Sequence, residues 1–195
     1  MKVALHHLDF SVEELLPLTQ LGRKTLERAK RGHPKAIRDL GCEYIWGEQG
    51  YPKDENRARH WYTIAADAGD TEAMWDVSGM YLCGQGGAKE IEKGLAYLRT
   101  AAVRRRWDLG VELSAQMLAD IYQNGWYKQP QDFVEAQKWR DLAKLQYKRY
   151  RGWKRKLGIR LSQASVQTSI PHPEVSQGRV IVKATLIYEG KSLLK

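Results

Sequence analysis

Cysteine, phenylalanine and long apolar runs are scarce in this sequence. The two cysteines, Cys42 and Cys83, are too few for a disulfide framework in a chain of 195 residues, which fits a reducing compartment. No apolar run approaches the roughly 20 residues that span a bilayer. His6, His7 and Asp9 interrupt the first apolar stretch, so it lacks the apolar segment of a secretion signal. We therefore expect a cytoplasmic protein with no membrane span.

Residues that could converge into a catalytic or metal site are also few. His6 and His7 have no thiols or carboxylates at ligand spacing, and the glycines at 84, 86 and 87 lack the lysine and serine of a phosphate loop. No nucleophile stands in a recognisable elbow motif. We expect a protein that is not an enzyme, with no catalytic residues, no cofactor and no metal.

Acidic residues are nearly missing from one end of the chain. The net charge is +9, yet residues 1–143 contain 20 Lys and Arg against 21 Asp and Glu, whereas residues 144–195 contain 12 against 2. The basic excess therefore belongs to the C-terminal quarter. There we predict a basic helix over residues 144–160, a linker over 162–178 and a strand over 179–188.

The sequence is rich in an internal repeat that appears when Tyr44, Tyr81 and Tyr122 are aligned. Each tyrosine follows small and aliphatic residues at helical spacing and precedes a glycine by three residues, which is typical of a helix that ends in a left-handed turn. A second helix follows, marked by a small residue, an aromatic residue and another small residue. The aligned positions are Ala36, Leu40, Gly41, Gly47, Ala58, Trp61 and Ala65 in the first unit, Ala73, Val77, Ser78, Gly84, Gly94, Tyr97 and Ala101 in the second, and Ser114, Leu118, Ala119, Gly125, Ala136, Trp139 and Ala143 in the third.

These units, with tyrosine spacings of 37 and 41 residues, predict antiparallel helical hairpins stacked as a solenoid. Small residues let the helix backbones approach, and most of the seven tryptophans should fill the space opposite them. The pattern resembles the Sel-one-like repeat (SLR) family, a relative of the tetratricopeptide repeat, over residues 28–146. The motif positions in the first unit are Ala36, Leu40, Gly41, Tyr44, Gly47, Gly50, Asp54, Ala58, Trp61, Tyr62, Ala65, Ala66 and Gly69.

The expected fold is all-α: a right-handed α-solenoid of about three helix-turn-helix repeats, with a basic C-terminal helix and a short extended or β tail. Ser11 and Glu14 have the spacing of a capping box, so we predict one amphipathic helix over 11–31. Residues 104–110 depart from the repeat spacing and should lengthen a helix or form a loop. The expected units are a capping half repeat (1–33), three repeats (34–70, 71–110, 111–146) and a C-terminal extension (147–195).

In such a stack the first helices line the concave side, and their non-packing positions face a partner. That face should be mildly acidic with exposed aromatic rings, which is typical of a binding surface as well as of a solvated one. The predicted protein-binding residues are Asp39, Glu43, Trp46, Trp75, Asp76, Met80, Gln116, Asp120 and Gln123.

The resemblance implies a protein-binding module, because members of the family act as adaptors, regulators and, in bacteria, immunity proteins. A short chain of three repeats favours an immunity protein that neutralises a cognate toxin, whose basic cleft would suit an acidic groove. A regulatory adaptor is the first alternative. Nucleic-acid binding through the basic helix, where Tyr147, Tyr150 and Trp153 could stack on bases, is the second and less favoured one. The sequence indicates neither the partner nor the oligomeric state.

Overall fold

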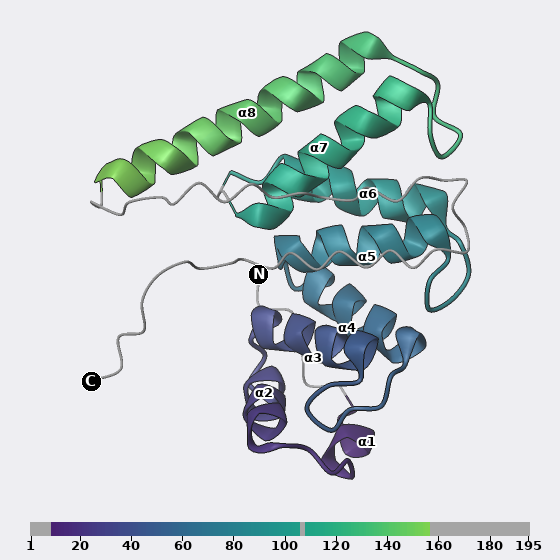
Figure 1. Ribbon diagram of the computed structural model, residues 1–195, viewed down its shortest axis with the longest axis vertical. Coiled ribbons are helices and arrows are strands. Elements are labelled where there is room, and N and C mark those ends of the chain that lie inside the picture. Colours follow the sequence, from purple (N-terminus) through teal and green to yellow (C-terminus); the bar gives the residue numbers. More distant parts are fainter. Residues whose placement is uncertain (1–8, 106–107, 157–195) are drawn as a thin grey trace.

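The computed structural model describes residues 9–105 and 108–156, with side chains through residue 152 (Figure 1). Every regular element in this part of the chain is an α-helix, so the predicted all-α fold is confirmed. The predicted linker and strand at 162–188, and His6 and His7, lie outside the described residues. The helices are α1 (Ser11–Glu14), α2 (Gln20–Lys30), α3 (Pro34–Trp46), α4 (Glu55–Asp67), α5 (Thr71–Cys83), α6 (Ile91–Ala102), α7 (Leu109–Asn124) and α8 (Phe133–Lys156).

Helices α3 to α8 form three hairpins that stack one on the next (Figure 1). Within each hairpin the two helices pack along each other, and neighbouring hairpins meet through α4 against α5 and α6 against α7. The first helices α5 and α7 also contact each other, and Arg38 of α3 forms an ion pair with Glu72 of α5, so the first helices form one continuous face. This arrangement is the predicted repeat stack.

The helix ends follow local sequence signals. Asp54, Asp70 and Asp108 cap α4, α5 and α7, each accepting a hydrogen bond from the backbone N–H three residues on, at 3.0, 2.8 and 3.0 Å. The first helices all end at a glycine in the left-handed conformation, as predicted. These glycines are Gly47, Gly84 and Gly125, with φ of 69°, 76° and 67°.

Small residues facing large ones hold the hairpins together. Gly41 on α3 lies against the ring of Tyr62 on α4, and a Cβ at Gly41 would stand 2.7 Å from that ring. Trp61, Leu40 and Tyr44 are buried in the core around this contact. The close approach of α3 and α4 therefore depends on the missing side chain at residue 41.

The prediction of a single N-terminal helix over 11–31 is wrong. The chain forms α1 and α2 with Pro17 between them, and Ser11 caps nothing with its side chain; its N–H donates to Asp9 Oδ1 at 2.9 Å. Proline disfavours a helical conformation in the residue before it, which explains the break. Glu14, the other half of the expected capping box, forms an ion pair with Lys30.

The buried residue of α1 is Glu13. Its Oε1 atom accepts hydrogen bonds from Tyr44 Oη at 2.7 Å, Arg57 Nη1 at 3.1 Å and Trp61 Nε1 at 3.3 Å. Phe10 stacks on Trp61 with ring centroids 5.0 Å apart. These contacts fix α1 on the first hairpin.

The other two repeat tyrosines bond to the preceding hairpin. The Tyr81 hydroxyl lies 3.3 Å from Thr63 Oγ1, and the Tyr122 hydroxyl accepts from Arg99 Nη2 at 3.1 Å. In the first hairpin, Glu13 of α1 bonds to the equivalent tyrosine, and α2 contacts α3 as α4 contacts α5. The N-terminal segment therefore covers the first hairpin, with α2 in the place of the second helix of a preceding repeat.

The irregular segment after the second hairpin adds a helical turn. α6 ends at Ala102, and α7 begins 13 residues before Tyr122, whereas α3 and α5 begin 10 residues before their tyrosines. Gly110 in this extra turn lies against α5, where a Cβ would stand 2.3 Å from the carbonyl carbon of Thr71. The added turn therefore packs on the second hairpin.

Candidate functional site

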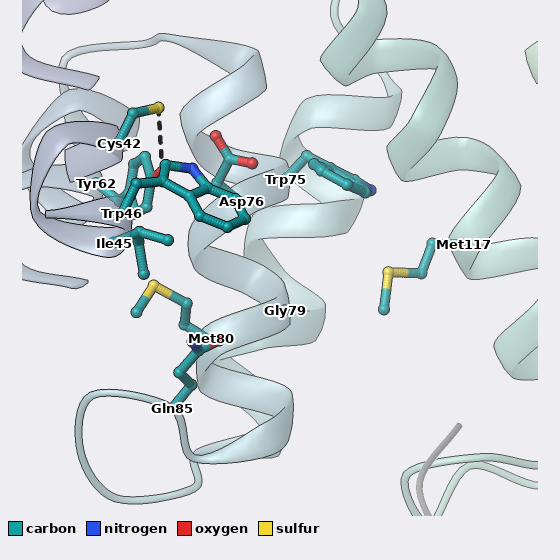
Figure 2. A pocket seen from close by; sticks show the side chains of 10 residues that line it. All are labelled: Cys42, Ile45, Trp46, Tyr62, Trp75, Asp76, Gly79, Met80, Gln85 and Met117. Carbon is teal, nitrogen blue, oxygen red and sulfur yellow. Dashed lines mark hydrogen bonds between the residues drawn. The ribbon is translucent and has the colours of Figure 1, made fainter. Parts of the chain in front are cut away.

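A pocket of about 120 Å³ opens on the face formed by the first helices (Figure 2). It lies along α5, with residues of α3 on one side and Met117 of α7 on the other. Four of the nine predicted binding residues line it, namely Trp46, Trp75, Asp76 and Met80. The full lining is Cys42, Ile45, Trp46, Tyr62, Trp75, Asp76, Gly79, Met80, Gln85 and Met117.

Two tryptophans line opposite parts of this pocket. Trp46, at the end of α3, is 37% exposed and lies near Cys42 and Tyr62, whereas Trp75 points toward the side of Met117 (Figure 2). Trp75 is half-buried and also packs against the core. Met80 is buried and closes the pocket from below. The lining is thus mainly apolar and aromatic.

Gly79 lies in the middle of α5 at the pocket and has open space where a side chain would be. A Cβ added there meets no atom within 4 Å, and its backbone is not in the left-handed region. Gly41, Gly94 and Gly110 differ, because a Cβ at each would collide with a neighbouring helix. Glycine costs roughly 0.5–1 kcal/mol relative to alanine inside a helix, and neither packing nor backbone conformation requires it at residue 79.

The carboxylate of Asp76 lies at the pocket without an ion pair among the described residues. The nearby guanidinium of Arg38 pairs instead with Glu72, with Asp70 at 3.8 Å and with Asp39 at 3.6 Å. Burial raises the pKa of Asp76 to about 7; Arg38 partly opposes this, and Glu72 and Asp70 add to it. Four carboxylates therefore surround one guanidinium, and the surplus charge is negative.

The pKa values of other acids on the same face are also raised. Burial, reinforced by Glu48 and Asp39, raises the pKa of Glu43 to about 7. Burial also raises the pKa of Asp39 and of Asp120, against the opposing effect of nearby cations. The face is acidic, as the sequence predicted, but its carboxylates hold their protons more tightly than exposed ones do.

The three predicted residues of α7 are half-buried and lie outside the pocket lining. Gln116 donates to Glu112 at 3.1 Å, and Gln123 accepts from Arg140 at 3.1 Å. The backbone carbonyl of Asp120 accepts from Asn124 at 2.8 Å. Their polar groups take part in contacts within α7 and with α8.

Six lining residues were not predicted as binding residues, and Gly79, described above, is one of them. Met117 stands five residues before Tyr122, the same register as Asp39 and Asp76 in their repeats, so the repeat alignment itself could have identified it. Cys42 lies 3.2 Å from the Tyr62 hydroxyl, and burial raises the pKa of its thiol to about 12, which makes it unreactive at neutral pH. The remaining three are Ile45, Tyr62 and Gln85.

Metal and membrane features are absent from the described part of the chain. No three residues among its His, Cys, Asp and Glu come together in a way that could hold a metal ion. None of its helices is both long and apolar enough to cross a bilayer.

The stacked hairpins and their first-helix pocket define an α-solenoid repeat protein. The profile of the Sel1 repeat matches residues 34–70, 71–102 and 113–143. The chain belongs to the Sel1 repeat family, whose members are generally non-catalytic scaffolds with repeats that typically mediate protein–protein interactions. The family resemblance seen in the sequence is thus confirmed.

The solved structures that are similar to this chain include two Sel1 repeat proteins of bacteria. A Sel1 repeat protein from Oxalobacter formigenes is 25% identical with a TM-score of 0.55, and the match covers 61% of this chain and 45% of that one. The protein c5321, a protective antigen of uropathogenic Escherichia coli with an SLR fold, is 28% identical with a TM-score of 0.55. The match covers 69% of this chain and 29% of c5321. The curated proteins include none that matches the chain.

Proposed function

We propose that this chain binds another protein through the face formed by α3, α5 and α7, with one side chain of the partner inserted in the pocket at Gly79. The open space at Gly79 is the observation that carries the proposal. A pocket of about 120 Å³ is smaller than the roughly 300–1,000 Å³ of small-molecule sites, so it suits one side chain of a larger ligand. Half-buried aromatic rings around such a pocket are typical of binding hot spots.

Within this function, the more specific proposal is an immunity protein in the cytoplasm that neutralises a cognate toxin. Blocking a toxin requires one complementary surface, and the three hairpins present one continuous face. Acidic residues on that face would speed association with a basic cleft. A regulatory adaptor, the alternative, would use the same face for several weaker partners.

The test is affinity capture from the native host with the intact chain as bait. Gly79→Phe should fill the pocket with little disturbance of the fold, because a Cβ at residue 79 meets no atom within 4 Å and the ring would extend into the pocket. Gly152→Phe on α8 is the matched control, since a Cβ at Gly152 also meets no atom within 4 Å. We expect a partner that is captured by the parent and the control and lost with Gly79→Phe.

The number of partners distinguishes the two roles. One tightly bound protein whose toxicity the chain suppresses in coexpression supports the immunity role, and several weak partners support the adaptor role. If every captured protein is retained by Gly79→Phe, the pocket is not the binding site.

A further inference from the structure

We infer that the partner side chain in the pocket is basic, a lysine or an arginine whose cation contacts the Asp76 carboxylate and whose stem lies along the tryptophans. This inference rests on the proposed function and specifies the chemistry of its partner. A lysine or arginine stem is apolar and its head is cationic, and both features have counterparts in the lining. Its evidence is the charge around Asp76 and the composition of the pocket.

The charge around Asp76 favours a cation. Arg38 forms ion pairs with Asp39, Asp70 and Glu72, which leaves Asp76 as the carboxylate of this cluster that has no ion pair with a described residue. A basic side chain would reduce the negative excess of this cluster. An acidic side chain would add a fifth negative charge and be repelled.

A purely apolar side chain fits the charge pattern less well. Inserting it would cover the Asp76 carboxylate and remove water from it without offering a hydrogen bond, which is costly for a buried polar group. Tryptophan faces also attract cations, most strongly when water is excluded. Trp46 and Trp75 can therefore stabilise the same side chain that Asp76 pairs with.

Panning a phage-displayed library of 12-residue peptides on the intact immobilised chain tests this inference. Phage that bind Gly79→Phe are removed first, so that the remaining peptides depend on the pocket. We expect lysine or arginine at one common position. In synthetic peptides, norleucine at that position, which keeps the stem and removes the ammonium, should raise the Kd about tenfold, equivalent to about 1.4 kcal/mol. Asp76→Asn should raise it similarly, and the two changes together should raise it little further.

The other outcomes separate the inference from the proposed function. Pocket-dependent peptides with an apolar residue at the common position, unaffected by Asp76→Asn, would overturn the basic side chain and leave the binding face intact. A complete lack of pocket-dependent peptides would count against both. If a second copy of the chain occupies the pocket, Gly79→Phe will lower the sedimentation coefficient of the chain alone, which also overturns the inference.

Discussion

Glu13 and Asp76 are both shielded from water, but their surroundings differ. Glu13 is 1% exposed and accepts three hydrogen bonds, one of them from the guanidinium of Arg57. Asp76 is half-buried beside a guanidinium that pairs with other acids. The Glu13 carboxylate stabilises the fold, whereas the ionised carboxylate of Asp76 costs free energy in the folded state.

Removing the Glu13 carboxylate should detach α1. Glu13→Ala leaves the buried donors of Tyr44 and Trp61 and the half-buried guanidinium of Arg57 without this acceptor, and we expect it to lower the free energy of unfolding by about 3 kcal/mol in urea titrations. Glu14→Ala is the control, because the side chain of Glu14 is 56% exposed and its ion pair with Lys30 is a surface contact worth roughly 1 kcal/mol or less. Equal losses in the two variants would contradict the capping role of Glu13.

Asp76 should make stability depend on pH. Its pKa rises from 3.8 to about 7 on folding, so its contribution to stability is fully present below pH 4 and is lost as the pH rises through 7. Asp76→Asn cannot ionise, and we expect it to exceed the parent in stability at pH 8 by on the order of 1 to 2 kcal/mol. Urea unfolding at pH 5 should show a smaller difference. The same difference at both pH values would show that ionisation of Asp76 is not its cause.

At the scale of helices, the sequence predicts what is local and misses what is distant. The three hairpins could be predicted because helix periodicity, the aspartate caps and the terminal glycines act within a few residues. The break between α1 and α2 has a local signal in Pro17, but the packing of α1 on the first hairpin depends on Glu13, whose hydrogen-bond partners lie 31, 44 and 48 residues further on. The helical periodicity of the sequence gives no information about contacts between residues so far apart in the chain.

The pocket could be predicted in part for the same reason. Trp46, Trp75, Asp76 and Met80 follow from the repeat register of single helices. Tyr62 belongs to a second helix, and it reaches the pocket only because Gly41 allows α4 to approach α3. Pocket residues from different helices depend on how the helices pack, which one repeat pattern does not describe.

Two glycines on neighbouring first helices should respond oppositely to the same substitution. Gly79→Ala should stabilise the protein by roughly 0.5–1 kcal/mol, because alanine favours the helix and meets no atom. Gly41→Ala should destabilise it by about 1–3 kcal/mol, because its Cβ would press on the Tyr62 ring. Thermal melts should therefore shift up by a few degrees for the first and down for the second. Shifts of the same sign would show that the helix contacts are misassigned.

In the described part of the stack α8 is the last helix, and two of its polar side chains occupy positions that are buried in α4 and α6. Gln137 and Lys144 are exposed on α8. Their equivalents in α4 are the buried Arg59 and Ala66, and in α6 the buried Leu95 and Ala102. This position contacts the next hairpin, as Arg59 illustrates: its guanidinium donates to Ala88 O at 2.8 Å and to Glu90 at 2.7 Å there. Polar terminal faces keep repeat arrays from adding further units.

Making this face apolar should cause the chains to associate. We expect Gln137→Leu combined with Lys144→Ala to produce dimers or larger species whose share grows with concentration in sedimentation velocity runs. Lys138→Leu with Lys148→Ala makes a comparable change at two other exposed α8 positions and should leave the sedimentation of the parent unchanged. If both variants associate to the same extent, the association is nonspecific and does not use a repeat-like interface.

The open position at Gly79 has a consequence for how such a protein can diverge. Neither helix packing nor backbone conformation requires glycine at this position. Alanine, serine or valine there would therefore make the pocket shallower and leave the hairpin contacts intact. Most single substitutions lower stability, whereas alanine at this position is expected to raise it. Paralogues of this chain could therefore acquire different partners through a single substitution at residue 79, with no compensating mutation elsewhere.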